Sequence, residues 1–164
     1  MTLLALQATA ETFSEDELTA FEGLVLAAGE VQMEGLRELI LNAPALIRIF
    51  RDDTLVGVAG VKFPRRSYQS RVFKLAGLDE MAAQFPLEFG WASVLESQRG
   101  SGVGTLIAAT AVKIASKQGG IFATCREKNE TIQYVLKRSG FVDMGEAYQS
   151  SRGPYTNRLL GLKI

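Results

Sequence analysis

Three glycines within five residues, Gly100, Gly102 and Gly104, follow an apolar run and precede a helical pattern. A helix N-terminus presents unpaired N–H groups and a partial positive charge, and glycine lets these donors approach a phosphate closely. The turn that starts at Arg99 therefore predicts a phosphate cradle, although a plain flexible turn would have the same composition. A P-loop is excluded, because no Gly-Lys-Ser/Thr ending is present. The dinucleotide fingerprint is also excluded, because Thr105 stands where its last glycine belongs.

Glu88 is the candidate for proton transfer, since it lies in the apolar run at residues 87–96 that leads into this turn. Strand alternation would place Glu88 on one face with Gly90, Ala92 and Val94, provided that no bulge intervenes. These small side chains would leave room for a ligand. An edge-exposed or salt-bridged glutamate explains the residue about equally well.

Composition limits the function classes. The 164 residues are 47% hydrophobic and 22% charged, which suits one globular domain over residues 1–164. Eighteen basic residues balance eighteen acidic ones, so the net charge does not indicate binding to nucleic acid or to an anionic membrane. With no histidine and a single cysteine, Cys125, the chain has almost no ligands for a Cys/His zinc site and no internal disulfide. We expect a cytoplasmic protein without a metal, a nucleic-acid partner or a membrane partner.

The pattern of apolar residues predicts the elements that position these groups. Residues 14–28 are predicted as a helix, because Ser14 and Glu17 have the spacing of a capping box. Further helices are predicted at residues 33–41, 102–117 and 129–139, with shorter ones at 70–76 and 79–85. Strands are predicted at residues 1–7, 45–50, 55–61, 87–96, 121–125, 141–144 and 159–164, the second and third forming a hairpin. The order is mixed α/β, with a βαβα run in the second half.

Residues 88–104, EFGWASVLESQRGSGVG, resemble the central motif of the GNAT (Gcn5-related N-acetyltransferase) superfamily, whose core reads Arg/Gln-x-x-Gly-x-Gly/Ala. Arg99, Gly102 and Gly104 match that core. Residues 136–141, LKRSGF, are similar to the family's closing helix and its Gly-Phe entry into the next strand. The resemblance implies a mixed, mostly antiparallel central sheet of six to seven strands flanked by helices. Within that sheet, a splayed parallel strand pair would hold acetyl-CoA.

The resemblance also implies which residues bind the cofactor. In this family the pantetheine arm bonds to the strand before the turn, and the pyrophosphate meets the N–H groups of the turn. The implied cofactor-binding residues are Ser93, Val94, Leu95, Arg99, Gly100, Ser101, Gly102, Val103, Gly104, Thr105 and Asn129. Asn129 has a second interpretation as the cap of the helix that it opens. Lys128, Lys137 and Arg138 would either meet the 3′-phosphate or form a solvated helix face.

For catalysis, the resemblance implies direct transfer of the acetyl group to an amine, with Glu88 where family members often carry the general base. Leu136 departs from the pattern, because many members have a tyrosine there as the general acid. Tyr134 is two residues away from that place. The acid is therefore Tyr148, Cys125, a water molecule or no group at all. Cys125 is not predicted as a nucleophile, because no histidine exists to activate it.

The sequence says least about the acceptor of the acetyl group. Family members determine it with the N-terminal helices and the loop before the central strand, here residues 14–41 and 64–86. The basic run at residues 64–71 suits an anionic acceptor, the phosphates of the cofactor or a solvated loop. We expect an acetyl-CoA-dependent N-acetyltransferase that acts on a primary amine of a small molecule or a protein, and we allow for a homodimer. The alternative is a catalytically silent acyl-CoA-binding or sensing module.

Overall fold

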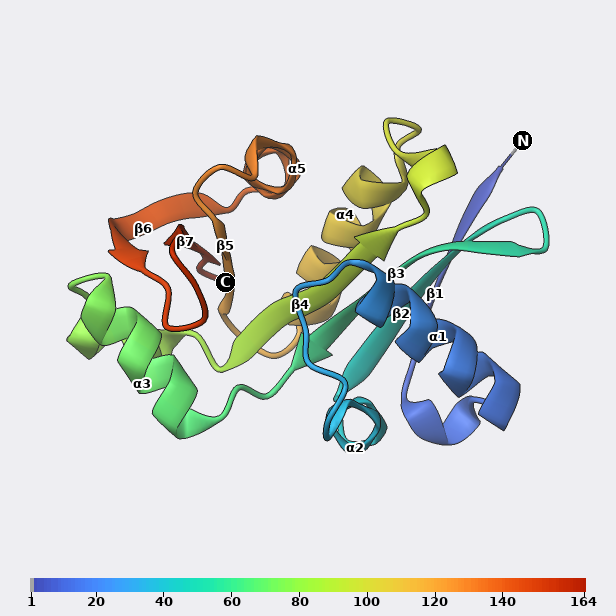
Figure 1. Ribbon diagram of the computed structural model, residues 1–164, viewed down its shortest axis with the longest axis horizontal. Coiled ribbons are helices and arrows are strands. Elements are labelled where there is room, and N and C mark those ends of the chain that lie inside the picture. The colour runs from blue at the N-terminus through green and yellow to red at the C-terminus, as the bar shows by residue number, and fades with distance from the viewer. Residues whose placement is uncertain (1) are drawn as a thin grey trace. The chain divides into compact units, whose positions relative to one another are not determined.

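The computed structural model describes residues 2–164, so Met1 of the first predicted strand lies outside the described residues. The strands are β1 (Leu3–Ala8), β2 (Ala45–Arg51), β3 (Thr54–Lys62), β4 (Leu87–Val94), β5 (Ile121–Arg126), β6 (Val142–Gln149) and β7 (Thr156–Leu162). The α-helices are α1 (Glu15–Ala27), α2 (Leu36–Leu41), α3 (Arg66–Leu75), α4 (Val103–Ala115) and α5 (Glu130–Arg138) (Figure 1). Three short 3-10 helices are η1 (Ala10–Thr12), η2 (Asp79–Gln84) and η3 (Glu96–Gln98). Across residues 2–164, no helix is long and apolar enough to cross a membrane.

The seven strands form one sheet in the order β1-β2-β3-β4-β5-β7-β6. The pairs β1–β2, β2–β3, β5–β7 and β6–β7 are antiparallel, whereas β4 and β5 run parallel. The parallel register joins Leu87 to Ile121 and Glu88 to Phe122. A mixed, mostly antiparallel sheet with flanking helices and one parallel pair confirms the expected fold class.

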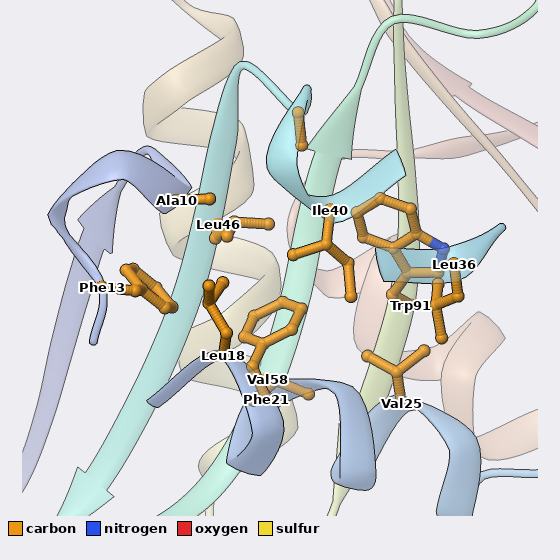
Figure 2. Packing of buried hydrophobic residues seen from close by; sticks show 11 residues of the cluster. Ala10, Phe13, Leu18, Phe21, Val25, Leu36, Ile40, Leu46, Val58 and Trp91 are labelled. Atoms are coloured by element: carbon orange, nitrogen blue, oxygen red, sulfur yellow. The ribbon is translucent and has the colours of Figure 1, made fainter. Parts of the chain in front are cut away.

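The chain divides into two compact units, each with its own core. The first unit contains the described residues up to Lys62 together with Phe89–Ile114, and the second contains Phe63–Glu88 and Ala115–Ile164. In the first unit, apolar side chains from η1, α1 and α2 pack against β2, β3 and β4 (Figure 2). This cluster consists of Ala10, Phe13, Leu18, Phe21, Val25, Leu36, Ile40, Ala43, Leu46, Val58 and Trp91.

Two glycines of β3, Gly57 and Gly60, let neighbouring side chains pack closely on the two faces of the sheet. On the face of α1 and α2, the ring of Trp91 lies on the bare backbone of Gly60, where a Cβ atom would be 2.4 Å from Trp91 Cε3. On the face of α4, a Cβ atom at Gly57 would be 2.6 Å from Cγ1 of Val103, the first residue of that helix. Trp91 itself has a left-handed φ of 57°, which interrupts the alternation of β4. The alternation of side chains that starts at Glu88 therefore cannot be extended past Trp91 to Ala92 and Val94.

Replacement of Gly60 by alanine is expected to lower the free energy of unfolding by about 1–3 kcal/mol, because the new methyl group must displace a buried indole ring. Denaturant unfolding followed by fluorescence measures the change. Gly23→Ala is the matched control, because a Cβ atom there meets nothing within 4 Å. Since Gly23 lies inside α1, this control should gain about 0.5–1 kcal/mol. Equal effects of the two substitutions would contradict the close packing at Gly60.

The predicted capping box at the start of α1 is confirmed. Glu17 N–H donates to Ser14 Oγ at 3.1 Å, and Ser14 N–H donates to Glu17 Oε1 at 2.9 Å. The same glutamate accepts from the guanidinium of Arg48, a buried residue of β2 whose Cζ lies 3.9 Å from the centroid of the Phe13 ring. One carboxylate thus joins the helix start to the sheet.

Glu17 should make the stability of the protein sensitive to acid. The backbone N–H of Ser14, and after it the side chain of Arg48, lower the pKa of this carboxyl group in the folded state. Its stabilising effect is therefore complete above the ordinary glutamate pKa and is lost as the pH falls through the lower, folded-state pKa. We expect Glu17→Gln to lower the Tm at pH 7 and to lower it much less at pH 3. A Tm difference that is independent of pH would contradict this.

The second unit has its core between α3, η2 and the strands β5, β6 and β7. The buried members are Val72, Phe73, Ala76, Phe85, Phe122, Met144, Tyr148 and Leu159. The Phe73 and Phe122 rings meet edge to face, with centroids 5.2 Å apart. Gly145, with a φ of 64°, lets β6 approach the end of α3, because a Cβ atom there would be 2.1 Å from the Ala76 carbonyl oxygen.

Several predicted boundaries were wrong. α3 begins at Arg66 instead of residue 70, because its first turns are polar and only Tyr68 contacts the core. β6 runs to Gln149 instead of residue 144, since the sequence VDMGEAYQ contains a glycine that bends the strand without ending it. β4 ends at Val94, two residues early, where η3 follows.

Candidate functional site

The glycine-rich turn joins η3 to α4 in the first unit. Gly100 and Gly102 both have left-handed φ angles, 75° and 90°, which a residue with a side chain rarely adopts. The carbonyl oxygen of Gly102 accepts from Leu106 N–H at 3.1 Å, so Gly102 is the residue at which helical hydrogen bonding begins. The N–H groups of the first helical turn have no acceptor within a helix. Backbone donors at the start of α4 are therefore available for an anion.

Arg51, which the sequence analysis did not select, holds this turn to the end of β2. Its Nε donates to Gln98 Oε1 at 2.8 Å, and its Nη2 donates to Ser101 Oγ at 3.1 Å. The Ser101 hydroxyl in turn donates to the backbone oxygen of Gln98. The side chain of Ser101 thus stabilises the turn. Nothing in the sequence indicated that residue 51 would lie beside residue 101.

Removal of the Arg51 guanidinium should weaken cofactor binding without changing the chemical step. We expect Arg51→Met to raise the KM for acetyl-CoA about fivefold at an unchanged kcat, because about 1 kcal/mol of hydrogen bonding would be lost from the turn. Steady-state kinetics at saturating amine measure the change. Lys117→Met, which removes a charge from an exposed position after α4, should leave the KM unchanged. A decrease in kcat alone would contradict the proposed positioning of the turn.

The three residues predicted to face pantetheine, Ser93, Val94 and Leu95, differ in how far their backbone groups are open to a ligand. Leu95 N–H already donates to Val56 O of β3 at 2.9 Å. Successive N–H groups along a strand point to opposite edges, so Val94 directs its N–H and C=O away from β3. The side chain of Ser93 is buried. Among the three residues, Val94 is therefore the one whose backbone groups could pair with an extended ligand.

Glu88 lies in the second unit, at the last residue pair of the parallel register. It is only 7% exposed, which is unusual for a carboxylate. Its register partner Phe122 packs against α3, so Glu88 lies on the same face of the sheet. Thr124, two residues further along β5, shares that face, and its Oγ1 is 3.0 Å from the hydroxyl of Tyr68 on α3. Tyr148 of β6 packs in the same core as Phe122.

Glu88, Tyr68, Thr124 and Tyr148 are called the Glu88 cluster below. Burial, and after it the negative charge of Glu88, raises the pKa of Tyr68 above its usual range. Burial is also the main reason why the pKa of Tyr148 rises to about 12, and Glu88 adds to that effect. Both phenols therefore keep their protons near neutral pH. They can act as neutral hydrogen-bond donors beside a buried carboxylate.

The other candidates for the general acid do not improve on Tyr148. Leu136 is buried, and its aliphatic side chain has no acidic proton to donate. Burial raises the pKa of Cys125 to about 11, which opposes formation of a thiolate and agrees with the expectation that Cys125 is not a nucleophile. Tyr134 is exposed, and its hydroxyl accepts from Arg138 Nη1 at 3.0 Å.

The residues around α5 are mostly explained by local structure. Asn129 caps the helix, since its Oδ1 accepts from Ile132 N–H at 3.2 Å. Lys137 pairs with Asp143 of β6, with a separation of 3.0 Å between Nζ and Oδ2. Lys128 is exposed. The cap at Asn129 is confirmed, whereas contacts of these residues with a cofactor stay predictions.

Tyr68 and Thr124 are the members of the cluster that the sequence analysis missed. Tyr68 stood in a basic run whose helix was predicted to begin two residues later, and Thr124 was one residue of a short apolar strand. Their pairing depends on how α3 lies across β5, which no local pattern encodes. Among the described residues, no group of three or more Cys, Asp or Glu side chains is placed to hold a metal ion.

Comparison with known proteins agrees with this architecture. The model of the acetyltransferase (GNAT) family matches residues 10–141, and the chain therefore belongs to that family. It is an N-acetyltransferase of a family that uses acetyl-CoA as the acetyl donor. No curated protein sequence matches the chain.

Solved structures share the fold at low sequence identity. The chain is similar to a ribosomal-protein-alanine N-acetyltransferase from Brucella melitensis, with 17% identity, a TM-score of 0.72, and coverage of 98% of this chain and 99% of that one. It is also similar to Arabidopsis thaliana NAA60 in complex with acetyl-CoA, with 15% identity, a TM-score of 0.71 and 99% of both chains covered. An acyl-CoA N-acyltransferase from Pseudomonas aeruginosa has 17% identity and a TM-score of 0.67, over 96% and 99% of the two chains.

Proposed function

We propose that this protein transfers an acetyl group from acetyl-CoA to a primary amine of a small molecule or a protein by direct attack, with Glu88 as the general base. The observation that carries the proposal is the position of Glu88. A carboxylate only 7% exposed stands at the end of the parallel register, on the face that also holds Tyr68, Thr124 and Tyr148.

In the proposed reaction, the acceptor first gives a proton to Glu88. An alkylammonium ion has no lone pair to attack with, so a carboxylate must remove this proton directly or through water. The amine nitrogen then bonds to the thioester carbonyl carbon, the C–S bond breaks, and the thiolate of coenzyme A leaves. The attacking nitrogen loses its second proton, which reaches the leaving thiolate directly or through water, and the proton held by Glu88 returns to solvent, which balances the step.

We propose that no side chain needs to act as a strong acid toward the leaving thiolate. Thiols ionise near pH 8.5 or somewhat above, so a thiolate is a tolerable leaving group. The phenols of Tyr68 and Tyr148, whose pKa values are raised, are weak acids but good donors. They support the reaction by donating hydrogen bonds near Glu88.

For the donor, we propose that the backbone from Arg99 to Thr105 binds the pyrophosphate and that Val94 pairs with the pantetheine arm. The left-handed glycines and the start of α4 support the first part. The position of Val94 beyond the register that β4 shares with β5 supports the second. Asn129 is proposed as a further pantetheine contact, made in addition to its capping bond.

Two measurements test the proposal in order. Thermal-shift titration with acetyl-CoA should raise the Tm with ligand concentration, because a ligand that binds only the native state stabilises it. A thiol-release assay on a panel of primary amines should then detect free coenzyme A. The absence of a thermal shift at millimolar acetyl-CoA would overturn the assignment of the donor site.

The alternative raised by the leucine at position 136, a silent acyl-CoA-binding module, does not agree with membership of an N-acetyltransferase family. It predicts the same thermal shift, but no thiol release with any small amine, peptide N-terminus or lysine side chain. Thiol release with one amine of the panel is enough to reject it.

We further propose that residues 1–164 act as one catalytic domain in the cytoplasm. The single cysteine, Cys125, suits a reducing compartment. The proposal of a homodimer is tested by light scattering coupled to size-exclusion chromatography.

A further inference from the structure

The side-chain amide of Gln69 on α3 joins this helix to the segment that leads into β4. Its Nε2 donates to the carbonyl oxygen of Ala82 at 2.8 Å and to that of Phe85 at 2.7 Å. A glutamine amide carries two N–H donors, so both are used here. The Ala82 oxygen also accepts from Phe85 N–H at 3.1 Å, at the end of η2. Gln69 therefore fixes the point at which η2 ends and the chain turns toward Glu88.

Glu88 follows this segment closely in the chain. Pro86, which comes directly after Phe85, has no N–H group to donate into the sheet. The register that β4 shares with β5 joins two residue pairs, and Glu88 is in the second of them. No residue of η2 is buried, so apolar packing holds η2 less firmly than the core. The path of the backbone into Glu88 therefore depends in part on the two bonds from Gln69.

Consecutive residues of α3 contact the approach to β4 and the strand β5. While Gln69 binds the segment before β4, the hydroxyl of Tyr68 lies 3.0 Å from Thr124 Oγ1 on β5. Phe73, one turn further along α3, packs against Phe85, with ring centroids 5.6 Å apart. Within the second unit, α3 thus holds the approach to β4 at a fixed place relative to β5.

We propose that Gln69 is a positioning residue for the acetyl transfer. By holding the carbonyl groups of Ala82 and Phe85, it sets the distance between the Glu88 carboxylate and the amine whose proton this carboxylate takes. Proton transfer requires the two heavy atoms to lie within hydrogen-bond reach, so a small displacement of the strand slows the reaction by a large factor. This inference rests on the proposed function, because Gln69 acts through Glu88 as the base.

Gln69→Met tests the proposal, because methionine has a similar length but no donor for either carbonyl group. We expect kcat to fall about 10- to 100-fold, the effect of displacing a reacting group by about 1 Å. The KM for acetyl-CoA should stay within about twofold, since both bonds of Gln69 go to residues outside the proposed cofactor site. Thiol release with the best amine of the panel measures both constants, at a temperature well below the Tm of the variant.

Combining this change with Glu88→Gln separates a positioning role from a purely structural one. If Gln69 acts through Glu88, Gln69→Met should lower the activity that remains in Glu88→Gln by less than about twofold, because residues that act as a unit are not additive. A structural defect elsewhere would lower kcat by the same factor in both backgrounds. Should Gln69→Met fail to fold, Gln69→Asn takes its place, since the shorter side chain keeps the amide but cannot reach both carbonyl groups.

Gln133 provides the matched control. Its Nε2 also donates to two backbone carbonyl groups, those of Arg126 at 3.3 Å and Glu127 at 2.7 Å, in the same unit but on α5. Gln133→Met removes equivalent bonds and should lower the Tm to a similar extent, while kcat stays within about twofold of the wild type.

The outcomes are distinguishable. An unchanged kcat in Gln69→Met, an equal loss with and without Glu88→Gln, or an equal loss in Gln133→Met would each overturn this inference and leave the proposed function standing. Undiminished turnover of Glu88→Gln would overturn the proposed base and this inference with it. The absence of thiol release with every amine would overturn both as well.

Discussion

Glu88→Gln is expected to lower kcat/KM for the amine by about 10²–10⁴-fold, the usual contribution of a general base. Glutamine keeps the size of the side chain but cannot accept the proton of an ammonium ion. Because the substitution changes none of the residues proposed to bind coenzyme A, the thermal shift with acetyl-CoA should persist. Thiol release at several pH values measures the effect. The activity that remains should rise with pH as more of the amine becomes neutral.

The matched control for this variant is Glu146→Gln, in which an exposed glutamate of β6 is neutralised in the same unit. It should retain wild-type turnover. Undiminished turnover of Glu88→Gln would remove the proposed base. A loss of fold, detected as a lower Tm without ligand, would require the same comparison with Glu88→Asp, which keeps the carboxylate and should recover part of the activity.

Gly102→Ala is expected to raise the KM for acetyl-CoA by about 5- to 30-fold. The left-handed φ of 90° at this position costs a residue with a Cβ atom about 1–2 kcal/mol, so the turn would rotate its N–H groups away from the phosphate. A Cβ atom at Gly102 would meet nothing within 4 Å, which means that the effect comes from the backbone and not from a clash. Steady-state kinetics and thermal-shift titration measure it.

Gly29→Ala separates binding from stability. Gly29, after α1, also has a left-handed φ, 76°, and equally open space around its Cα. The same strain should lower the Tm of both variants by a similar amount. Only Gly102→Ala should lose affinity for acetyl-CoA. An equal KM in the two variants would contradict a role for the turn in phosphate binding.

Local signals in the sequence were sufficient for much of the fold. The capping box at Ser14, the hairpin around Asp52 and the glycine turn before α4 each depend on neighbouring residues, and each was predicted correctly. The order of strands and helices followed from these elements and from the family motif. Boundaries were wrong where packing decides them, as at the start of α3.

The candidate site was less predictable because it is assembled from distant segments. Glu88 was selected from its strand, but its neighbours Tyr68, Thr124 and Tyr148 come from three other elements. Their approach depends on the strand register and on the position of α3, and neither leaves a periodic trace in the sequence. The left-handed φ of Trp91 was likewise unpredictable, because tryptophan rarely adopts that conformation.

The bonds from Arg51 to Gln98 and Ser101 have a kinetic consequence. They hold the turn in place in the absence of a ligand, and we propose that acetyl-CoA therefore meets a turn that is already ordered. A rigid recognition element needs no slow rearrangement after the encounter. Stopped-flow traces of cofactor binding to the wild type should therefore fit one exponential whose rate rises linearly with acetyl-CoA concentration. In the free enzyme, the proposed pyrophosphate site is then already formed.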